Sequence, residues 1–427
     1  MLTQEQNELL VRTGPGTQMG NLFRRYWIPA LLSEELPGPD CDPVQVKLLS
    51  EALIAFRDTD GRIGLLGELC AHRQVSLWFG RNEEGGLRCP YHGWKYDATG
   101  RCVEVPSESA EFAASVKITS YPCVERGGVI WTYMGPPEHQ PPAPDFEWSA
   151  VPASQRYVNK RWQENNYMQA MEGGIDGAHV SWLHSGALNN EPMRIGSKGA
   201  QYQRDNKPKI EVMDTPTGIL IGARRNADEG QAYWRVTQWI MPFHQMIPPY
   251  GDHALHGHAW VPIDDENCWA WTFTHHPTRD LNAEEHAAMQ NPEGIYAQLI
   301  PGTYRTVANK SNNYLMDRAA QRAKRHYSGV PGIAMQDASL QESSGPIVDR
   351  SKEYLSSTDM GIVKARNRLL RAARALAEQG TTPPAIDPAS HRVRSASFVK
   401  PANQLFAEAV QEVIEAGARP GMAHLSI

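Results

Sequence analysis

Between residues 43 and 135, short stretches of alternating hydrophobic and polar residues are separated by turn-forming residues. VQVKLL (44–49), ALIAFRD (52–58) and GRIGLLG (61–67) follow one another, and Asp60-Gly61 is typical of a hairpin. GGVIWTYMG (127–135) is a further predicted strand. The pattern predicts a small antiparallel β domain over residues 43–135.

The pattern changes after a proline-rich stretch at residues 136–146, which predicts an extended linker. Beyond it we expect a helix near residues 165–183, antiparallel strands between 210 and 274, and helices towards the end of the chain. The segment 359–380 carries apolar residues at helical spacing, with Gly380 as its expected stop. Strands followed by segregated helices indicate an α+β domain over residues 147–427.

Composition excludes several classes of protein. A hydrophobic content of 41% and a charged content of 21% are ordinary for a globular chain, and 427 residues suffice for two domains. A net charge of −6 argues against nucleic acid or an anionic membrane as the main ligand. The chain shows no secretory signal and no long apolar run, so we expect a cytoplasmic protein. Its 6 cysteines are too few for a disulfide framework and favour metal ligation or burial.

The first metal-binding pattern combines Cys70-Ala71-His72 with Cys89-Pro90-Tyr91-His92. Each segment supplies one thiolate and one imidazole, so together they offer two sulfurs to one iron and two nitrogens to another. This division is what a Rieske [2Fe–2S] cluster requires. Structural zinc sites are the main alternative, but they usually pair cysteine with cysteine and histidine with histidine.

The second pattern is Asp176-x2-His179-x4-His184. Asp176 and His179 would share one face of a helix, where the carboxylate could orient the imidazole. His184 would point about 140° away from His179 in an ideal helix, so the helix must bend, unwind or end between them if both bind one ion. Two histidines and one carboxylate are typical ligands of non-haem iron.

The carboxylate ligand must come from elsewhere in the chain. The segment MQDASLQESSGPIVDR offers Asp337, Glu342 and Asp349, of which we favour Asp337. The alternative for Asp337 is a helix cap or a surface position.

These motifs, with TGPGTQMGNLFRRYWIPAL, RVTQWIMPF and QDASLQESSGPIVDR, resemble the Rieske non-haem iron oxygenases, and specifically the phthalate 4,5-dioxygenase oxygenase subunits. The resemblance implies a Rieske β domain and a helix-grip (START-like) catalytic domain, with residues 1–42 packing on the latter. It implies a [2Fe–2S] cluster on Cys70, His72, Cys89 and His92, and iron on His179, His184 and Asp337.

The resemblance further implies a head-to-tail homotrimer or hexamer, in which Asp176 bridges His179 to His92 of the adjacent subunit. Electrons would come from NADH through a separate flavin and ferredoxin reductase. Respiratory Rieske proteins carry cysteine or serine where this chain has Val75, Tyr91 and Trp94. Since fewer hydrogen bonds then reach the cluster sulfurs, we expect a potential near the low end of roughly −150 to +300 mV. One departure is Gly174, where the branch often has an acidic residue.

By the same resemblance, we expect O2-dependent oxidation of an aromatic carboxylate, by ring dihydroxylation or hydroxylation. Ser181 and Lys209 are the predicted substrate contacts, and Arg224, Arg225 and Arg235 are further possible anion anchors. An O- or N-demethylating monooxygenase is the alternative reaction. An electron-transfer Rieske protein and a binding protein that has lost catalysis are the alternatives from other classes.

Overall fold

The computed structural model describes residues 1–185, 205–228, 230–248 and 254–411. The chain forms two compact units, one of residues Thr13–Ala143 and one that joins Met1–Arg12 to Pro144–Ile427. The division after Ala143 lies inside the proline-rich stretch. The expected amino-terminal segment 1–42 is divided between the units, because its strand β1 (Trp27–Leu32) pairs with β10 (Val129–Tyr133). Only residues 1–12 belong to the second unit.

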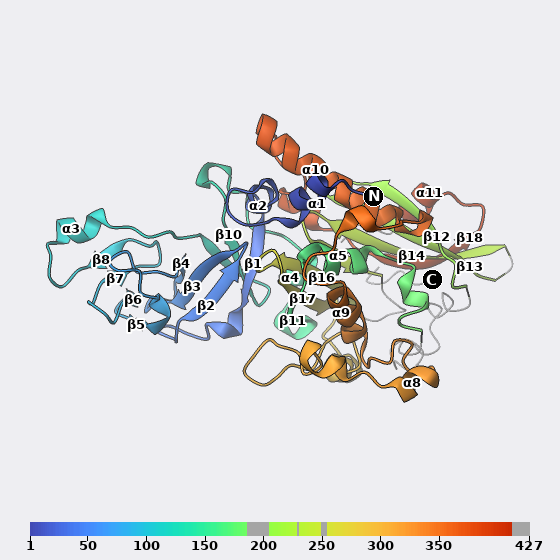
Figure 1. The fold of residues 1–427 in the computed structure, drawn as a ribbon, viewed down its shortest axis with the longest axis horizontal. Helices are drawn as coiled ribbons and strands as arrows, with labels where there is room; N and C mark the ends of the chain where they lie inside the picture. Colours follow the sequence, from blue (N-terminus) through green and yellow to red (C-terminus); the bar gives the residue numbers. More distant parts are fainter. Residues whose placement is uncertain (186–204, 229, 249–253, 412–427) are drawn as a thin grey trace. The chain divides into compact units, whose positions relative to one another are not determined.

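The first unit consists of small antiparallel sheets (Figure 1). One has the order β1-β10-β9, a second β2-β3-β4 and a third β5-β6-β7-β8. The remaining strands are β2 (Val44–Leu48), β3 (Glu51–Arg57), β4 (Ile63–Gly67), β5 (Arg81–Glu83), β6 (Gly86–Arg88), β7 (Lys95–Tyr96), β8 (Cys102–Glu104) and β9 (Cys123–Arg126). The helices are α2 (Gln18–Phe23) and α3 (Ala110–Ser115), with 3-10 turns η1 (Ser33–Glu35), η2 (Leu77–Phe79) and η3 (Pro137–His139).

The predicted hairpin is confirmed, since β3 and β4 are antiparallel neighbours. Gly61 has a φ of 83°, and the Asp58 carboxylate accepts the backbone N–H groups of Asp60 and Arg62. A glycine tolerates this left-handed conformation without steric cost. The turn therefore has the chemistry that its sequence indicated.

The second unit is built on one large antiparallel sheet. Among the described residues it has eight strands in the order β11-β17-β16-β15-β14-β13-β12, with β18 paired to β14. The strands are β11 (Arg156–Gln163), β12 (Lys209–Asp214), β13 (Gly218–Asn226), β14 (Gln231–Ile240), β15 (His244–Ile247), β16 (Leu255–Pro262), β17 (Cys268–His275) and β18 (Ala396–Pro401). Large side chains such as Trp234, Trp239 and Trp271 are almost fully buried in it.

Helices pack on this sheet, as the α+β prediction required. Helix α5 (Tyr167–Ile175) contacts β16 and α9 (Ile333–Ser343), and α10 (Met360–Gln379) contacts β12 and β13 (Figure 1). The other helices are α1 (Gln4–Val11), α4 (Glu147–Ala150), α7 (Ala283–Gln290), α8 (Arg318–Arg322) and α11 (Phe406–Val410). The 3-10 turns are η4 (Ala153–Gln155), η5 (His179–Ser181), η7 (Lys310–Leu315), η8 (Arg350–Lys352), η9 (Ser357–Asp359) and η10 (Pro388–His391).

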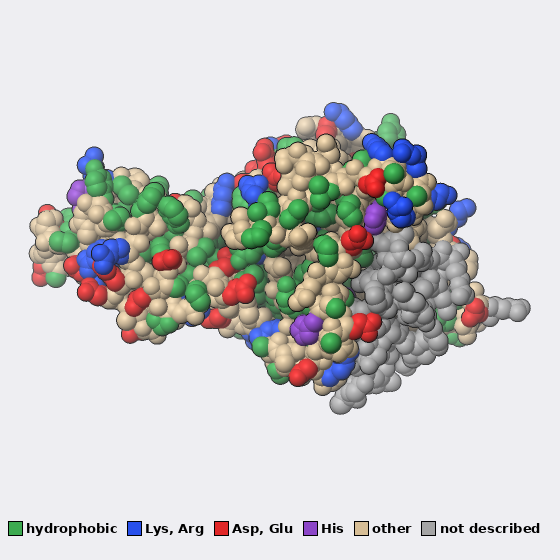
Figure 2. All heavy atoms as spheres, turned by 90° about the horizontal axis from the view of Figure 1, so that it is seen from below, with side chains coloured by type: hydrophobic (Ala, Val, Ile, Leu, Met, Phe, Trp, Pro, Cys, Tyr) green, Lys and Arg blue, Asp and Glu red, His purple; other side chains and the backbone are tan. Residues whose placement is uncertain are grey.

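The sequence prediction for α10 is confirmed, and Gly380 ends it with a left-handed φ of 67°. No helix among the described residues combines the length and apolar character needed to cross a membrane. On the face drawn in Figure 2, Lys and Arg side chains of the described residues are interspersed with Asp and Glu.

Candidate active site

Helix α5 ends immediately before the second metal-binding pattern. Asp176 is its C-terminal cap, in an extended conformation with φ −69° and ψ 119°, and a 3-10 turn begins at His179. Asp176 and His179 therefore do not share a helical face, because the helix has ended between them. The Asp176 carboxylate instead accepts the N–H groups of Ala178 and His179 and stabilises the turn.

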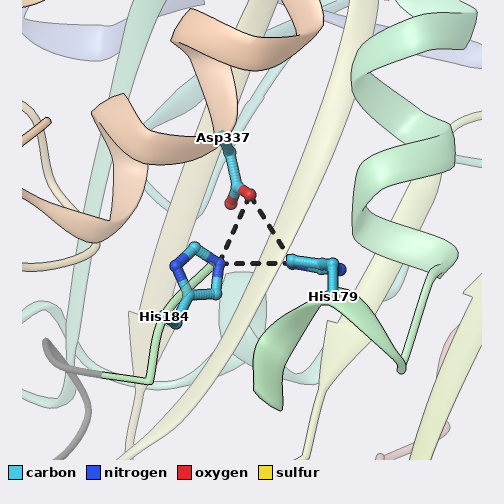
Figure 3. Close-up of side chains that lie close together, drawn as sticks. All are labelled: His179, His184 and Asp337. Carbon is cyan, nitrogen blue, oxygen red and sulfur yellow. Dashed lines mark hydrogen bonds and ion pairs between the residues drawn. The ribbon is translucent and has the colours of Figure 1, made fainter. Parts of the chain in front are cut away.

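This turn brings both histidines onto the same side, as binding to one ion requires. The Nε2 atoms of His179 and His184 lie 3.2 Å apart (Figure 3). Asp337, on α9, places its Oδ1 atom 3.5 Å from His179 Nε2 and 3.3 Å from His184 Nε2. Residues more than 150 positions apart in the sequence thus converge on one point.

The three donor atoms fit a metal ion. Two ligands at right angles, each about 2.1 Å from a metal, are separated by about 3.0 Å, close to the distances observed. Within the described part of the chain, these residues form a group of three possible ligands whose donor atoms all lie within 4.8 Å of one another. Two imidazoles and one carboxylate on one face match the facial donor set of non-haem Fe(II).

A buried glutamine orients His184. The Gln336 Oε1 atom lies 2.7 Å from His184 Nδ1, while the same amide donates through Nε2 to the carbonyl of Val330. Because Oε1 can only accept, His184 Nδ1 must carry the proton, which leaves Nε2 unprotonated for a metal. Gln336 is fully buried, so no solvent competes for this bond.

The ligand group is electrostatically coupled. Burial acts to raise the pKa of Asp337, but the adjacent His184 and His179 imidazoles outweigh it and the pKa is lowered. Burial acts to lower the pKa of His179, and the Asp176 carboxylate, 3.3 Å from Nδ1, outweighs it and raises the pKa. His179 Nδ1 and the Asp176 carboxylate are close enough for an ion pair, but the angle between them is not that of a hydrogen bond. The two carboxylates therefore stay ionised beside the imidazoles.

The ligands open into a cavity of about 120 Å³ that is partly open to solvent. Its walls are mainly apolar and come from the sheet, α9 and the segment 292–297, with Ile221, Ile247, Trp260, Ile295, Ile333 and Ala334. The polar side chains that line it away from the ligand group are Arg161, Arg235, Thr237, Gln245, His258 and Gln341. Such a cavity suits a small, largely apolar molecule.

Crowding around Gly174 explains why this chain lacks the acidic residue that the branch often has at that position. A Cβ atom there would overlap Gln245 and Trp260, both of which line the cavity. The Gln245 amide also donates to the Gly174 carbonyl. The space that a side chain would need is therefore occupied by cavity wall.

The remaining predicted residues lie elsewhere. Glu342 accepts from the Tyr314 hydroxyl at 2.6 Å, and Asp349 caps η8, so neither joins the ligand group. Ser181 does not line the cavity, because its hydroxyl accepts from Arg225 at 3.0 Å. Lys209 is exposed on β12 and does not line the cavity either. Substrate contacts at Ser181 and Lys209 stay predictions that the lining of this cavity does not support.

Of the other predicted cations, two bind backbone carbonyls and one lines the cavity. Arg225 donates to the carbonyl of Gly177 and Arg224 to that of Ala402, so both support the fold. Arg235 lines the cavity. Sequence reasoning missed Arg161 on β11 and His258 on β16, because the face of the sheet on which each side chain lies depends on sheet register.

The cluster motif lies in the first unit. Cys70 and Cys89 are buried, whereas His72 and His92 are exposed, with ring centroids 4.4 Å apart. Burial, and the neighbouring Cys70, raise the pKa of the Cys89 thiol. A buried sulfur pair beside an exposed imidazole pair fits a cluster that has cysteine ligands on one iron and histidine ligands on the other.

Tyr96 is a further cluster-site residue that the sequence reasoning missed. Its hydroxyl oxygen accepts the Ala71 N–H at 3.1 Å and lies 3.2 Å from Cys70 Sγ. Burial and the adjacent Cys70 raise the pKa of this hydroxyl, so it keeps its proton. A Cys70 thiolate bound to a cluster has no proton, so Tyr96 would be the donor to that sulfur.

Comparisons with known proteins agree with these two sites. The Rieske [2Fe-2S] domain family matches residues 26–122, and the "LigXa C-terminal domain like" family matches residues 132–404. The 3-chlorobenzoate-3,4-dioxygenase oxygenase subunit of Comamonas testosteroni is 37% identical, covering 97% of this chain and 99% of that protein. The phthalate 4,5-dioxygenase oxygenase subunit of Pseudomonas putida is also 37% identical, covering 87% of this chain and 86% of that protein.

The fold has solved counterparts. The structure of dicamba monooxygenase bound to dicamba matches with a TM-score of 0.59 and 20% identity, covering 83% of this chain and 99% of that one. Proteins of this kind carry a [2Fe–2S] cluster in the Rieske domain and a mononuclear non-haem iron in the catalytic domain. The chain belongs to the Rieske oxygenases, in the branch of the phthalate 4,5-dioxygenase and chlorobenzoate dioxygenase oxygenase subunits.

Proposed function

We propose that this chain is a terminal oxygenase component that uses O2 to oxidise an aromatic carboxylate, with electrons from NADH delivered by a separate reductase. The observation that carries the proposal is the His179, His184 and Asp337 group at the wall of a mainly apolar cavity. An electron-transfer protein or an inactive binding protein has no need for this group. The named substrates of the two 37% identical relatives support an aromatic acid.

We assign the cluster to Cys70, His72, Cys89 and His92, and the mononuclear iron to His179, His184 and Asp337. When bound, the cluster supplies single electrons and the mononuclear iron activates O2. The chain's own residues orient these groups: Gln336 fixes the proton on His184 Nδ1, and Asp176 holds the His179 ring. The apolar walls exclude water from the substrate.

Asp176 is also proposed to link two subunits. In a head-to-tail trimer or hexamer it would link His179 to His92 of the neighbouring subunit. One of its oxygens is 3.3 Å from His179 Nδ1, and its side chain keeps 22% of its surface exposed, so it remains accessible to a second partner. Such a bridge would carry electrons between subunits.

Iron and acid-labile sulfide analysis tests the ligand assignments. We expect about three irons and about two sulfides per chain, and the loss of one iron with no loss of sulfide in His179→Ala. Wild type and variant are then supplied with reductase, NADH and benzoate, 3-chlorobenzoate or phthalate. An unchanged iron count in the variant would exclude the mononuclear site, and product analysis distinguishes ring oxidation from the alternative, demethylation.

A separate test addresses Asp176. We expect Asp176→Asn to retain both metals but to slow single-turnover oxidation of the reduced cluster in the presence of substrate. Glu211→Gln, an exposed carboxylate change on β12, serves as the control. A normal single-turnover rate in Asp176→Asn would remove the bridging role.

A further inference from the structure

Arg161 is a charged side chain inside the cavity to which no role has been assigned. It lies on β11, lines the same cavity as Asp337, and donates through Nη2 to Gln163 Oε1 at 3.0 Å. Its Nε atom is buried and has no hydrogen-bond partner. An arginine remains charged in a protein even where burial lowers its pKa, as it does here.

No carboxylate among the described residues pairs with this guanidinium. Cys268, Asp337 and Glu342 influence its pKa electrostatically, and neither of the two carboxylates forms an ion pair with it. Asp337 is already committed to the two histidines, and Glu342 to the Tyr314 hydroxyl and the Glu164 N–H. Arg161 therefore has no counter-ion of its own in the part of the chain that the structure describes.

Arg161 is half-buried, and its buried Nε atom carries a desolvation cost that no counter-ion among the described residues offsets. We interpret such a residue as a binding group for a ligand that enters the cavity. The partner must be an anion, since Arg161 offers only N–H donors, and a planar carboxylate can accept two of them at once. Ile221, Trp260 and Ile333 in the surrounding walls can contact an apolar remainder of this partner.

The polar neighbour of Arg161 is consistent with this chemistry. His258 lines the cavity beside it, with its Nδ1 atom 3.1 Å from the Thr272 hydroxyl. Burial, with Arg161, lowers the pKa of His258 to about 4. His258 is thus neutral at neutral pH, so Arg161 and Arg235 are the cations that line the cavity among the described residues.

We propose that Arg161 is the residue that binds the carboxylate of the substrate and selects anionic aromatic substrates over neutral ones of the same shape. This inference rests on the proposed function and names the selecting residue. Arg224 and Arg225 do not compete for the role, because backbone carbonyls and Ser181 engage them. Arg235 lines the cavity and has interactions of its own.

Calorimetric titration of the iron-loaded protein with two matched pairs of probes tests the proposal. The pairs are benzoate with benzamide, and 3-chlorobenzoate with 3-chlorobenzamide. We expect wild type to favour each acid, and Arg161→Gln to weaken acid binding roughly 10- to 100-fold while the amide changes by less than about 3-fold. Arg161→Lys keeps the charge and should be intermediate. The control Arg224→Gln removes a cation that does not line the cavity and should leave both affinities unchanged.

Several outcomes would overturn the proposal. They are equal weakening of acid and amide, unchanged acid binding in Arg161→Gln, loss of iron from that variant, or a wild type that does not favour either acid. Loss of an uncompensated charge should leave the melting temperature equal or higher, and Arg161→Lys provides a second folded variant. A protein that binds the acids through Arg161 but consumes no O2 with reductase would remove the proposed function and leave the anion site standing.

Discussion

At the scale of single residues, the clearest effect is the control of the His184 ring by Gln336. Replacing Gln336 with Leu removes the acceptor for Nδ1–H and leaves the Val330 carbonyl without its donor. Loss of the hydrogen-bond partner of a metal-ligating histidine typically lowers metal affinity about 10- to 100-fold. We therefore expect Gln336→Leu to weaken iron binding by that factor. Competition with a chelator measures it.

Two variants control this experiment. Gln336→Glu keeps an acceptor at the same place and should retain most of the affinity. Ser343→Ala alters an exposed residue on the same helix and should have no effect. If Gln336→Leu bound iron as tightly as wild type, the orienting role would be wrong.

Tyr96 has the corresponding effect on the cluster. Its donated hydrogen bond stabilises the more negative, reduced form, so Tyr96→Phe should lower the potential. A differential bond energy of about 1 kcal/mol corresponds to about 40 mV for one electron. A spectroscopic redox titration measures the shift at constant iron and sulfide content. Tyr91→Phe, which alters an exposed ring, is the control; equal potentials for wild type and Tyr96→Phe would contradict the assignment.

At the scale of elements, a buried charge network holds α5 in place. Glu172 on α5 accepts two bonds from Arg350, at 2.9 and 3.0 Å, and one from Arg366 on α10 at 2.6 Å. Arg350 also donates to Asn7 on α1. Because α5 ends at Asp176, this network fixes the start of the segment that carries both histidines.

Removing one partner should strongly destabilise the second unit. Glu172→Gln leaves the buried Arg350 guanidinium without a carboxylate and leaves Arg366 with Glu353 alone. We expect a loss of about 3–5 kcal/mol in the free energy of unfolding. Denaturation in urea, with Glu211→Gln as an exposed control, measures it. A loss equal to that of the control would show that the network contributes little.

The same network predicts a pH dependence. Burial acts to raise the pKa of Glu172, but Arg350 and Arg366 outweigh it, and the folded pKa lies below the ordinary value of 4.5. A depressed carboxyl pKa stabilises the folded state above the unfolded pKa, and that stabilisation is lost as the pH falls through the folded pKa. The stability difference between wild type and Glu172→Gln should therefore shrink below about pH 4.5.

At the scale of the whole molecule, the head-to-tail arrangement can be tested by mixing two inactive variants. His179→Ala keeps the cluster, and His72→Ala keeps the mononuclear site. In randomly mixed heterologous rings, about one quarter of the interfaces would join an intact cluster to an intact iron site. We expect oxygenase activity near that fraction after co-refolding or co-expression. No recovery in mixed oligomers, with each metal retained, would place electron transfer within one chain.

The division of the chain shows where sequence reasoning succeeded. Local signals, such as the Asp60-Gly61 turn and the Gly380 stop, depend on backbone preferences of a few residues and are present in the structure as predicted. The course of residues 13–42 was not predictable, because the pairing of β1 with β10 joins residues about a hundred positions apart.

The sequence by itself determined which metals this protein can bind, since ligand identity and short spacing are local properties of the chain. It also identified Asp337, which lies beside His179 and His184 in the folded chain. Only the tertiary structure decided what surrounds these ligands: Gln336 behind His184, Tyr96 beside Cys70, and Arg161 in the cavity. The physical reason is that burial, register and the absence of a counter-ion arise from contacts between distant segments, which local residue patterns do not encode.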